Sequence, residues 1–153
     1  MRFALPLALM IAATPMAEAG PLANGQGCYV RTYSADHLAK HPDQLVRFIS
    51  LSPVPIASLP GQFVMNLMVN QRGSDDFPSA LITCKPNGAL LDCIAAENRG
   101  RLTISERFKG KLTLTVGSGG LVLAGQNRDV VISGTRGDDR SFLVPQVDGD
   151  QCN

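Results

Sequence analysis

The sequence predicts an all-β fold: a small antiparallel β-barrel or sandwich of about eight strands, stapled by disulfides and carrying one short N-terminal helix. Three observations predict it. After residue 44, apolar and polar residues alternate in short runs, turn-forming residues separate these runs, and the chain holds 4 cysteines. Because strands never alternate with helical stretches, a parallel α/β sheet is disfavoured.

Alternation is clearest in residues 63–70, 101–108 and 111–116, where nearly every second side chain is apolar. A period of two gives one buried face and one wet face, which is typical of an antiparallel sheet. Further strands are expected at 29–32, 46–52, 79–84, 89–96, 121–124, 129–134 and 141–146. The glycine-rich stretch Gly117–Gly120 is expected to be a turn between two of these strands.

Residues 35–41 form the helical stretch that the sequence predicts. Ser34 is a suitable N-cap, because its hydroxyl can accept a hydrogen bond from a free backbone N–H of the first turn. Pro42 ends the helix after about two turns.

The N-terminus has the pattern of a secretory signal peptide. Arg2 precedes an apolar run, and Ala17-Glu18-Ala19 gives the small-x-small pattern that signal peptidase reads. The run is shorter than the ~20 residues that span a bilayer, so no transmembrane segment is expected after cleavage. We expect a signal peptide at 1–19, a single β domain at 20–153, and a periplasmic or secreted protein.

The cysteines are expected to form structural disulfides, because an exported chain meets an oxidising compartment. Four cysteines allow three pairings. The turn-forming stretch between Cys84 and Cys93 favours that pair and leaves Cys28 with Cys152. The alternative is a metal site, but no C-x-x-C spacing occurs and the histidines lie far away in sequence. We therefore expect neither a metal nor a cofactor.

No constellation in the sequence supports catalysis, and the chain is expected not to be an enzyme. His37 and His41 lie four residues apart on one helix face, with Asp36 or Asp43 as an optional oxygen ligand, but the Glu of the zinc-protease pattern is absent. No G-x-S-x-G occurs. Paired acids such as Asp138-Asp139 lie in turns, where they are expected to cap nearby backbone N–H groups or to face water.

The candidate binding residues lie on one hairpin. Glu106 shares the parity of the apolar Leu102 and Ile104, so it points to the buried face unless a β-bulge reverses the parity. On the buried face it would need a partner, such as Arg47. The same hairpin carries Arg101, Arg107, Lys109 and Lys111, which could face an anionic partner or simply protect the strand edges.

These observations favour a non-catalytic binding or interaction module that contacts an envelope protein, glycan or lipid, or inhibits an enzyme. The net charge of +1 argues against nucleic acid as the main partner. In outline the architecture is similar to the small disulfide-stapled lysozyme and protease inhibitors of the Gram-negative periplasm, a likeness of fold that fixes no function. The alternative is a barrel that carries a small apolar ligand, with Glu106 as its polar anchor. A less favoured alternative is a metal enzyme that uses His37 and His41. The oligomeric state stays open.

Overall fold

The computed structural model describes residues 27–56, 59–108 and 110–152. The predicted signal peptide and Lys109 lie outside the described residues. Within the described residues, no helix is long and apolar enough to cross a membrane.

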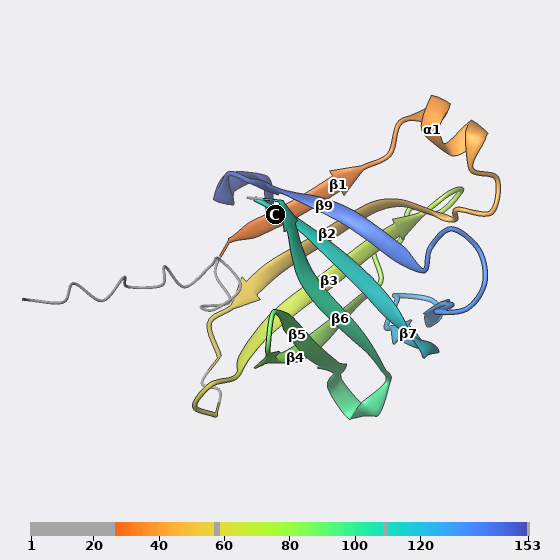
Figure 1. Cartoon of the computed structure of the whole chain (residues 1–153). Coiled ribbons are helices and arrows are strands. Elements are labelled where there is room, and N and C mark those ends of the chain that lie inside the picture. Colours follow the sequence, from red (N-terminus) through yellow and green to blue (C-terminus); the bar gives the residue numbers. More distant parts are fainter. Residues whose placement is uncertain (1–26, 57–58, 109, 153) are drawn as a thin grey trace, which may run out of the picture.

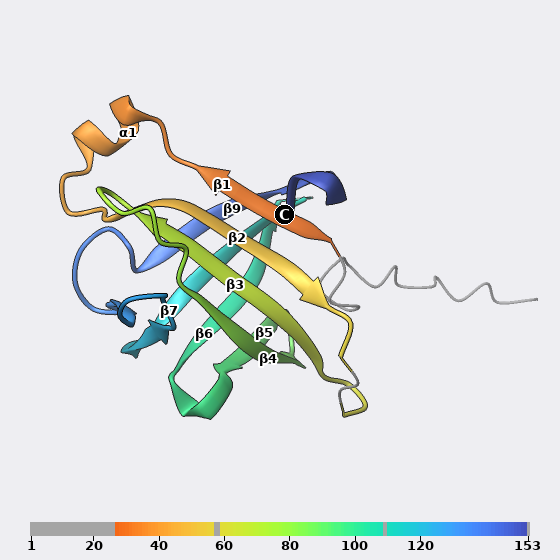
Figure 2. The same cartoon turned by 180° about the vertical axis from the view of Figure 1, so that it is seen from behind.

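The fold is an antiparallel barrel (Figures 1 and 2). In chain order the elements are β1 (Cys28–Thr32), α1 (Ala35–Lys40), β2 (Val46–Val54), β3 (Phe63–Gln71), β4 (Ser79–Asn87), β5 (Leu90–Ala95), η2 (Ala96–Asn98), β6 (Gly100–Phe108), β7 (Lys111–Leu123), β8 (Val130–Ile132), β9 (Ser141–Val147) and η3 (Gly149–Cys152).

Strand pairing closes the sheet on itself. The order β6-β5-β4-β3-β2-β1-β9-β7 is completed by pairing between β6 and β7, so eight strands form the barrel. The ninth strand, β8, pairs with the last residues of β7 outside this ring. The predicted all-β antiparallel fold is confirmed, and the barrel is the form that it takes.

The short helix is confirmed as well. The Ser34 hydroxyl accepts a hydrogen bond from the backbone N–H of His37 at 3.2 Å, and α1 ends at Lys40, before Pro42. The helix has no fully buried residue, so its position depends on polar contacts with the end of the barrel.

The expected turn at Gly117–Gly120 is wrong: these residues lie inside the single long strand β7. The first half of β7 pairs with β6 and β9, whereas its last residues pair with β8. A Cβ on Gly117 would lie 3.0 Å from the carbonyl oxygen of Arg101, and Gly120 has a φ of +80°. The glycines therefore allow the strand to bend closely over β6 instead of reversing the chain.

Side chains fill the barrel interior. Among the described residues, a hollow between the core side chains measures about 10 Å³, about the minimum that one water needs. It is lined by apolar side chains alone: Ile49, Leu67, Leu102, Leu114, Val116, Leu121, Ile132 and Phe142. This is the close packing of a protein core rather than of a ligand cavity.

Both predicted disulfides are present. Cys84 and Cys93 lie directly opposite each other on β4 and β5, with their Cα atoms 4.1 Å apart and both residues buried. This disulfide therefore helps to fill the interior. Cys28 at the start of β1 is joined to Cys152 in η3, with a Cα–Cα distance of 5.7 Å.

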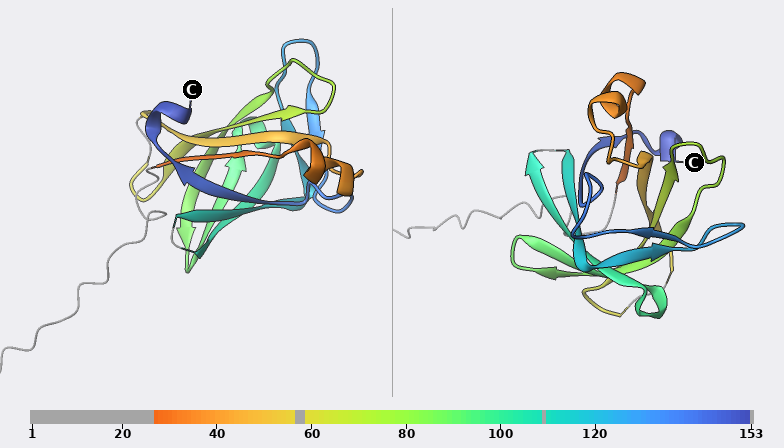
Figure 3. Two further views of the ribbon diagram at one scale, coloured as in Figure 1. Left: turned by 90° about the horizontal axis from the view of Figure 1, so that it is seen from above. Right: turned by 90° about the vertical axis from the view of Figure 1, so that its right-hand side faces the viewer.

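The barrel has two different ends. The end that we call the helix end carries α1, the loop 72–78, η2, and the β7–β8 ribbon with the loop 133–140 (Figure 3). The opposite end, which we call the disulfide end, carries the Cys28–Cys152 link and the β4–β5 turn. At the helix end, α1 and η2 lie on opposite sides of the barrel (Figures 1 and 3).

Candidate functional site

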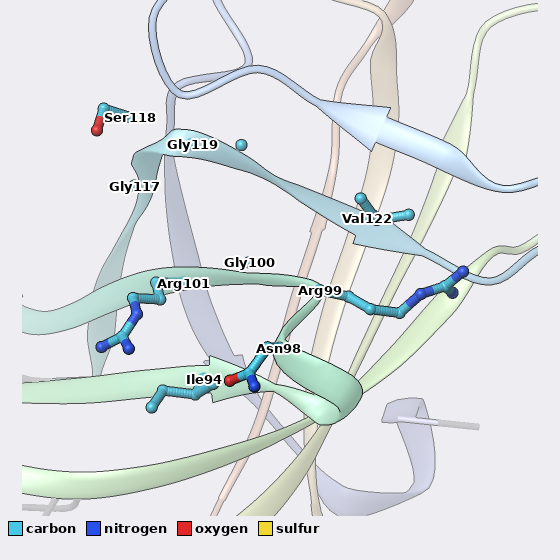
Figure 4. A pocket seen from close by; sticks show the side chains of 10 residues that line it. Ile94, Asn98, Arg99, Gly100, Arg101, Gly117, Ser118, Gly119 and Val122 are labelled. Carbon is cyan, nitrogen blue, oxygen red and sulfur yellow. The ribbon is translucent and has the colours of Figure 1, made fainter.

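A surface groove of about 690 Å³ lies at the helix end, where η2 leads into β6 and the bend of β7 passes over them (Figure 4). We call it the Arg101 groove. It is lined by Ile94, Asn98, Arg99, Gly100, Arg101, Gly117, Ser118, Gly119, Gly120 and Val122.

The backbone around the Arg101 groove has an unusual conformation. Glu97 and Asn98 are consecutive residues in the left-handed region, with φ values of 58° and 56°. Left-handed geometry costs about 1–2 kcal/mol for a residue with a side chain. Next to them, Gly100 has a φ of +123°, and a Cβ there would lie 2.3 Å from the carbonyl oxygen of Gly120. Such strain is typical of functional sites, where the surrounding structure holds it in place.

The two arginines of the groove differ in their partners. Arg99 forms an ion pair with Asp129 and lies 4.0 Å from the Glu97 carboxylate. Arg101 is exposed and forms no ion pair in the described part of the chain. In Figure 4 the two side chains extend in opposite directions, and Asn98 points toward Ile94. Arg101 is thus the uncompensated cation of the groove.

The structure separates the basic residues that the sequence groups together. Arg101 lies at the start of β6 and Arg107 near its end, six residues or about 20 Å away along the strand. The Arg107 guanidinium stacks over the Phe108 ring, 5.9 Å from its centroid. Lys111 lines a separate groove of about 600 Å³ at the disulfide end. The cluster is therefore not one continuous surface.

Glu106 has the inward register that its parity predicts, opposite the buried Leu112. It lies close to the disulfide end, where its Oε1 is 3.4 Å from the backbone N–H of Gly110. A register shift lies between Glu106 and Phe108, close to where the sequence allowed for a β-bulge. Arg47, the partner considered for Glu106, instead donates to the Asn70 side-chain oxygen and to the carbonyl of Ser74.

A buried tyrosine lies near Glu106. The Tyr29 side chain is 1% exposed, and its hydroxyl has no hydrogen-bond partner among the described residues. Burial raises the pKa of Tyr29, and the charge of Glu106 raises it further. Tyr29 therefore stays a neutral hydroxyl at physiological pH.

The two histidines share one helix face, as their spacing predicts. Their rings stack with centroids 4.3 Å apart. His37 Nε2 lies 3.0 Å from the Gln44 side-chain oxygen, and His41 Nδ1 lies 3.1 Å from the Asp138 carboxylate. The oxygen partners are thus Gln44 and Asp138 rather than Asp36 or Asp43. No group of three His, Cys, Asp or Glu side chains that could hold a metal occurs in the described ranges.

Asp139, next to Asp138, has a structural role that the sequence underestimates. It is 7% exposed and accepts hydrogen bonds from the backbone N–H groups of Leu45 at 2.8 Å and Val46 at 3.2 Å. Burial raises the pKa of Asp139, although these two hydrogen bonds act in the opposite direction. An acid in a turn was expected to cap backbone nearby, whereas this one caps backbone more than ninety residues away.

Sequence reasoning missed Asn98 and the groove-lining role of Gly117–Gly120. The run of glycines was the available signal, but a glycine turn and a glycine bend inside a strand look alike in sequence. Comparisons of the chain with protein-family models, curated proteins and solved structures found no match.

Proposed function

We propose that the protein is a non-catalytic binding module that contacts an envelope partner through the Arg101 groove. Acting as an inhibitor of a partner enzyme is one form of this function. The proposal includes export by the signal peptide predicted at 1–19, and the two disulfides fit an oxidising compartment.

The filled interior is the observation that carries this proposal. A ligand-binding cavity usually measures about 300–1,000 Å³, whereas the interior hollow lined by described core residues measures about 10 Å³. Binding is therefore expected on the outside, where the Arg101 groove has a volume of about 690 Å³. The carrier alternative finds no support in this packing, and we do not propose it.

The groove offers a defined chemistry to a partner. The Arg101 guanidinium presents several N–H donors to a carboxylate or phosphate group. The glycines of β7 expose backbone without side chains, which allows close approach by another chain. The strained turn at Glu97 and Asn98 holds the start of β6 in place, so little ordering is needed on binding.

The test is affinity capture from an envelope extract of the source organism, with mass spectrometry of proteins, glycans and lipids. Two variants alter the groove. Gly119→Leu introduces a bulky side chain where a Cβ meets nothing within 4 Å and the backbone is unstrained, and Arg101→Glu reverses the charge. We expect each variant to reduce capture of the partner at least tenfold.

Each variant has a matched control at the other end of the barrel. Gly149 also has open space and an unstrained backbone, so Gly149→Leu makes the same change outside the groove. Arg107→Glu makes the same charge reversal at the far end of β6. Capture that is equal for all five proteins, or no captured molecule with the wild type, would contradict the proposal.

A further inference from the structure

A second polar pocket lies at the helix end, beside α1. It measures about 320 Å³ and is lined by Arg31, Tyr33, His37, His41, Gln44, Asp138, Ser141 and Leu143. None of these residues lines the Arg101 groove. The pocket therefore needs its own explanation.

Four side chains of this pocket stack in a row, which we call the ring ladder: Arg31, Tyr33, His37 and His41. The Arg31 guanidinium lies 5.2 Å from the Tyr33 ring centroid, and Tyr33 lies 4.9 Å from His37. The second histidine ring follows at 4.3 Å. Local spacing explains the row, because residues two apart share a strand face and residues four apart share a helix face.

Arg31 brings a guanidinium group to this pocket. Its Nε is buried and has no acceptor in the described part of the chain. Leaving a buried donor without an acceptor costs about 1–3 kcal/mol. Arg31 also forms no ion pair among the described residues, so an anion in the pocket would meet an uncompensated guanidinium charge.

The hydrogen bonds of the histidines fix their tautomers. The Gln44 amide nitrogen donates to the carbonyl of Val46, so its oxygen accepts and His37 Nε2 donates. The Asp138 carboxylate can only accept, so His41 Nδ1 donates. His37 Nδ1 and His41 Nε2 have no partner among the described residues. A proton taken up at either atom adds a positive charge and an N–H donor to the ladder.

The remaining charged groups near the ladder are largely committed to other contacts. Asp139 accepts from backbone N–H groups, and Arg72 donates to the carbonyls of Leu38 and His41. Burial raises the pKa of Tyr33, Arg31 lowers it and Asp139 raises it. The helix and the turn after it add Asp36, Lys40 and Asp43. Among the described residues that line this pocket, Arg31 is the cation that forms no ion pair.

We propose that the pocket formed by the ring ladder binds an oxyanion, a carboxylate or a tetrahedral anion, which pairs with the Arg31 guanidinium. A proton on either histidine adds positive charge beside the bound anion, so proton binding and anion binding strengthen each other and the affinity for the anion rises as the pH falls. Two protonated rings 4.3 Å apart repel each other, and a bound anion offsets this repulsion.

The experiment is a titration of the disulfide-bonded mature protein with sodium sulfate or sodium acetate, at pH 5.5 and 8.0 and constant ionic strength. Chloride is the control, and NMR signals of the arginine Nε–H and histidine ring groups report binding. Sulfate keeps its charge over this range, so a change in affinity reports the protein. We expect saturable shifts at Arg31 and both histidines, with at least fivefold tighter sulfate binding at pH 5.5.

Variants separate the pocket from general charge. Arg31→Met abolishes the shifts, and Arg31→Lys, which keeps the charge but removes the planar guanidinium, weakens them. The double variant His37→Asn, His41→Asn binds equally at both pH values. Arg101→Met, in the other groove, leaves binding unchanged.

The relative affinity for sulfate and acetate tells which kind of oxyanion the pocket prefers. Shifts that persist in Arg31→Met, that disappear in Arg101→Met, or that never saturate at either pH overturn the proposal. These results do not depend on the envelope partner, so the two proposals can fail separately.

Discussion

The two ends of the barrel are held together by different chemistry. At the disulfide end, a covalent bond joins Cys28 to Cys152, 124 residues apart in sequence. At the helix end, side chains hold the loops through hydrogen bonds to backbone: Asp139 to Leu45 and Val46, and Arg72 to the carbonyls at the end of α1. Both grooves that we propose as binding sites, the Arg101 groove and the ring-ladder pocket, lie at the helix end.

The comparison teaches where polar surface can be placed on a barrel of this size. The alternating strands need their interior for apolar packing, so polar function is confined to the ends and the outer face. The left-handed residues Glu97 and Asn98 and the unpartnered Nε of Arg31 lie at the helix end, away from the Cys28–Cys152 disulfide.

The largest expected effect is at the disulfide end. Replacing both cysteines, Cys28→Ala and Cys152→Ala, removes a cross-link that restricts the unfolded chain over most of its length. We expect the free energy of unfolding, measured in urea, to fall by about 3–5 kcal/mol.

Native-state reduction provides a control for this prediction. Cys84 and Cys93 are both buried in the interior, whereas Cys152 is partly exposed. Mild reductant with thiol labelling should therefore open Cys28–Cys152 first. Labelling of Cys84 and Cys93 at the same rate would show that the interior opens together with the partly exposed link, which would contradict this order.

The next largest effect is at the helix end. Asp139→Ala leaves the backbone N–H groups of Leu45 and Val46 without their acceptor, and we expect it to cost about 2–4 kcal/mol of unfolding free energy. Asp139→Asn keeps one acceptor oxygen and should cost less. Equal losses in the two variants would mean that charge, rather than the hydrogen bonds, stabilises this loop.

The same residue predicts a pH dependence. Burial raises the pKa of Asp139 in the folded protein, so the native state binds a proton before the unfolded chain does as the pH falls. The contribution of Asp139 to stability therefore grows as the pH falls from above the raised pKa to the ordinary pKa near 4. Between pH 7 and pH 4, the free energy of unfolding of the wild type should rise relative to that of Asp139→Asn. A fall in the wild-type free energy of unfolding relative to this variant would mean that the two hydrogen bonds change the pKa of Asp139 more than burial does.

The smallest expected effect is at the strained turn of the helix end. Glu97→Gly relieves a left-handed conformation that costs about 1–2 kcal/mol, but glycine adds about 0.5–1 kcal/mol of unfolded-state entropy. We expect a net stabilisation of about 0.5–1 kcal/mol in thermal or urea unfolding. Gly88 at the disulfide end already has a φ of +61°, so Gly88→Ala should lower the free energy of unfolding. A destabilising Glu97→Gly would show that the turn is not strained.

Much of the fold could be predicted because its causes are local. The alternation in residues 63–70 and 101–108 depends on the strand period of two, and Ser34 and Pro42 act on the helix beside them. The Cys84–Cys93 pair follows from a turn between adjacent strands. The bend of β7 was the exception, since glycine permits both a turn and a bend and only the neighbouring strands choose between them.

The candidate sites depended on contacts that no local period specifies. Arg101 was predicted as exposed, but its groove exists because β7 bends over the start of β6. His41 meets Asp138 across 97 residues, and Asp139 reaches Leu45 across 94. The sequence by itself determined which side chains face inward and which cysteines lie near each other. Tertiary structure decided which loops meet at the helix end, because closing the barrel sets the register that brings distant strand ends together.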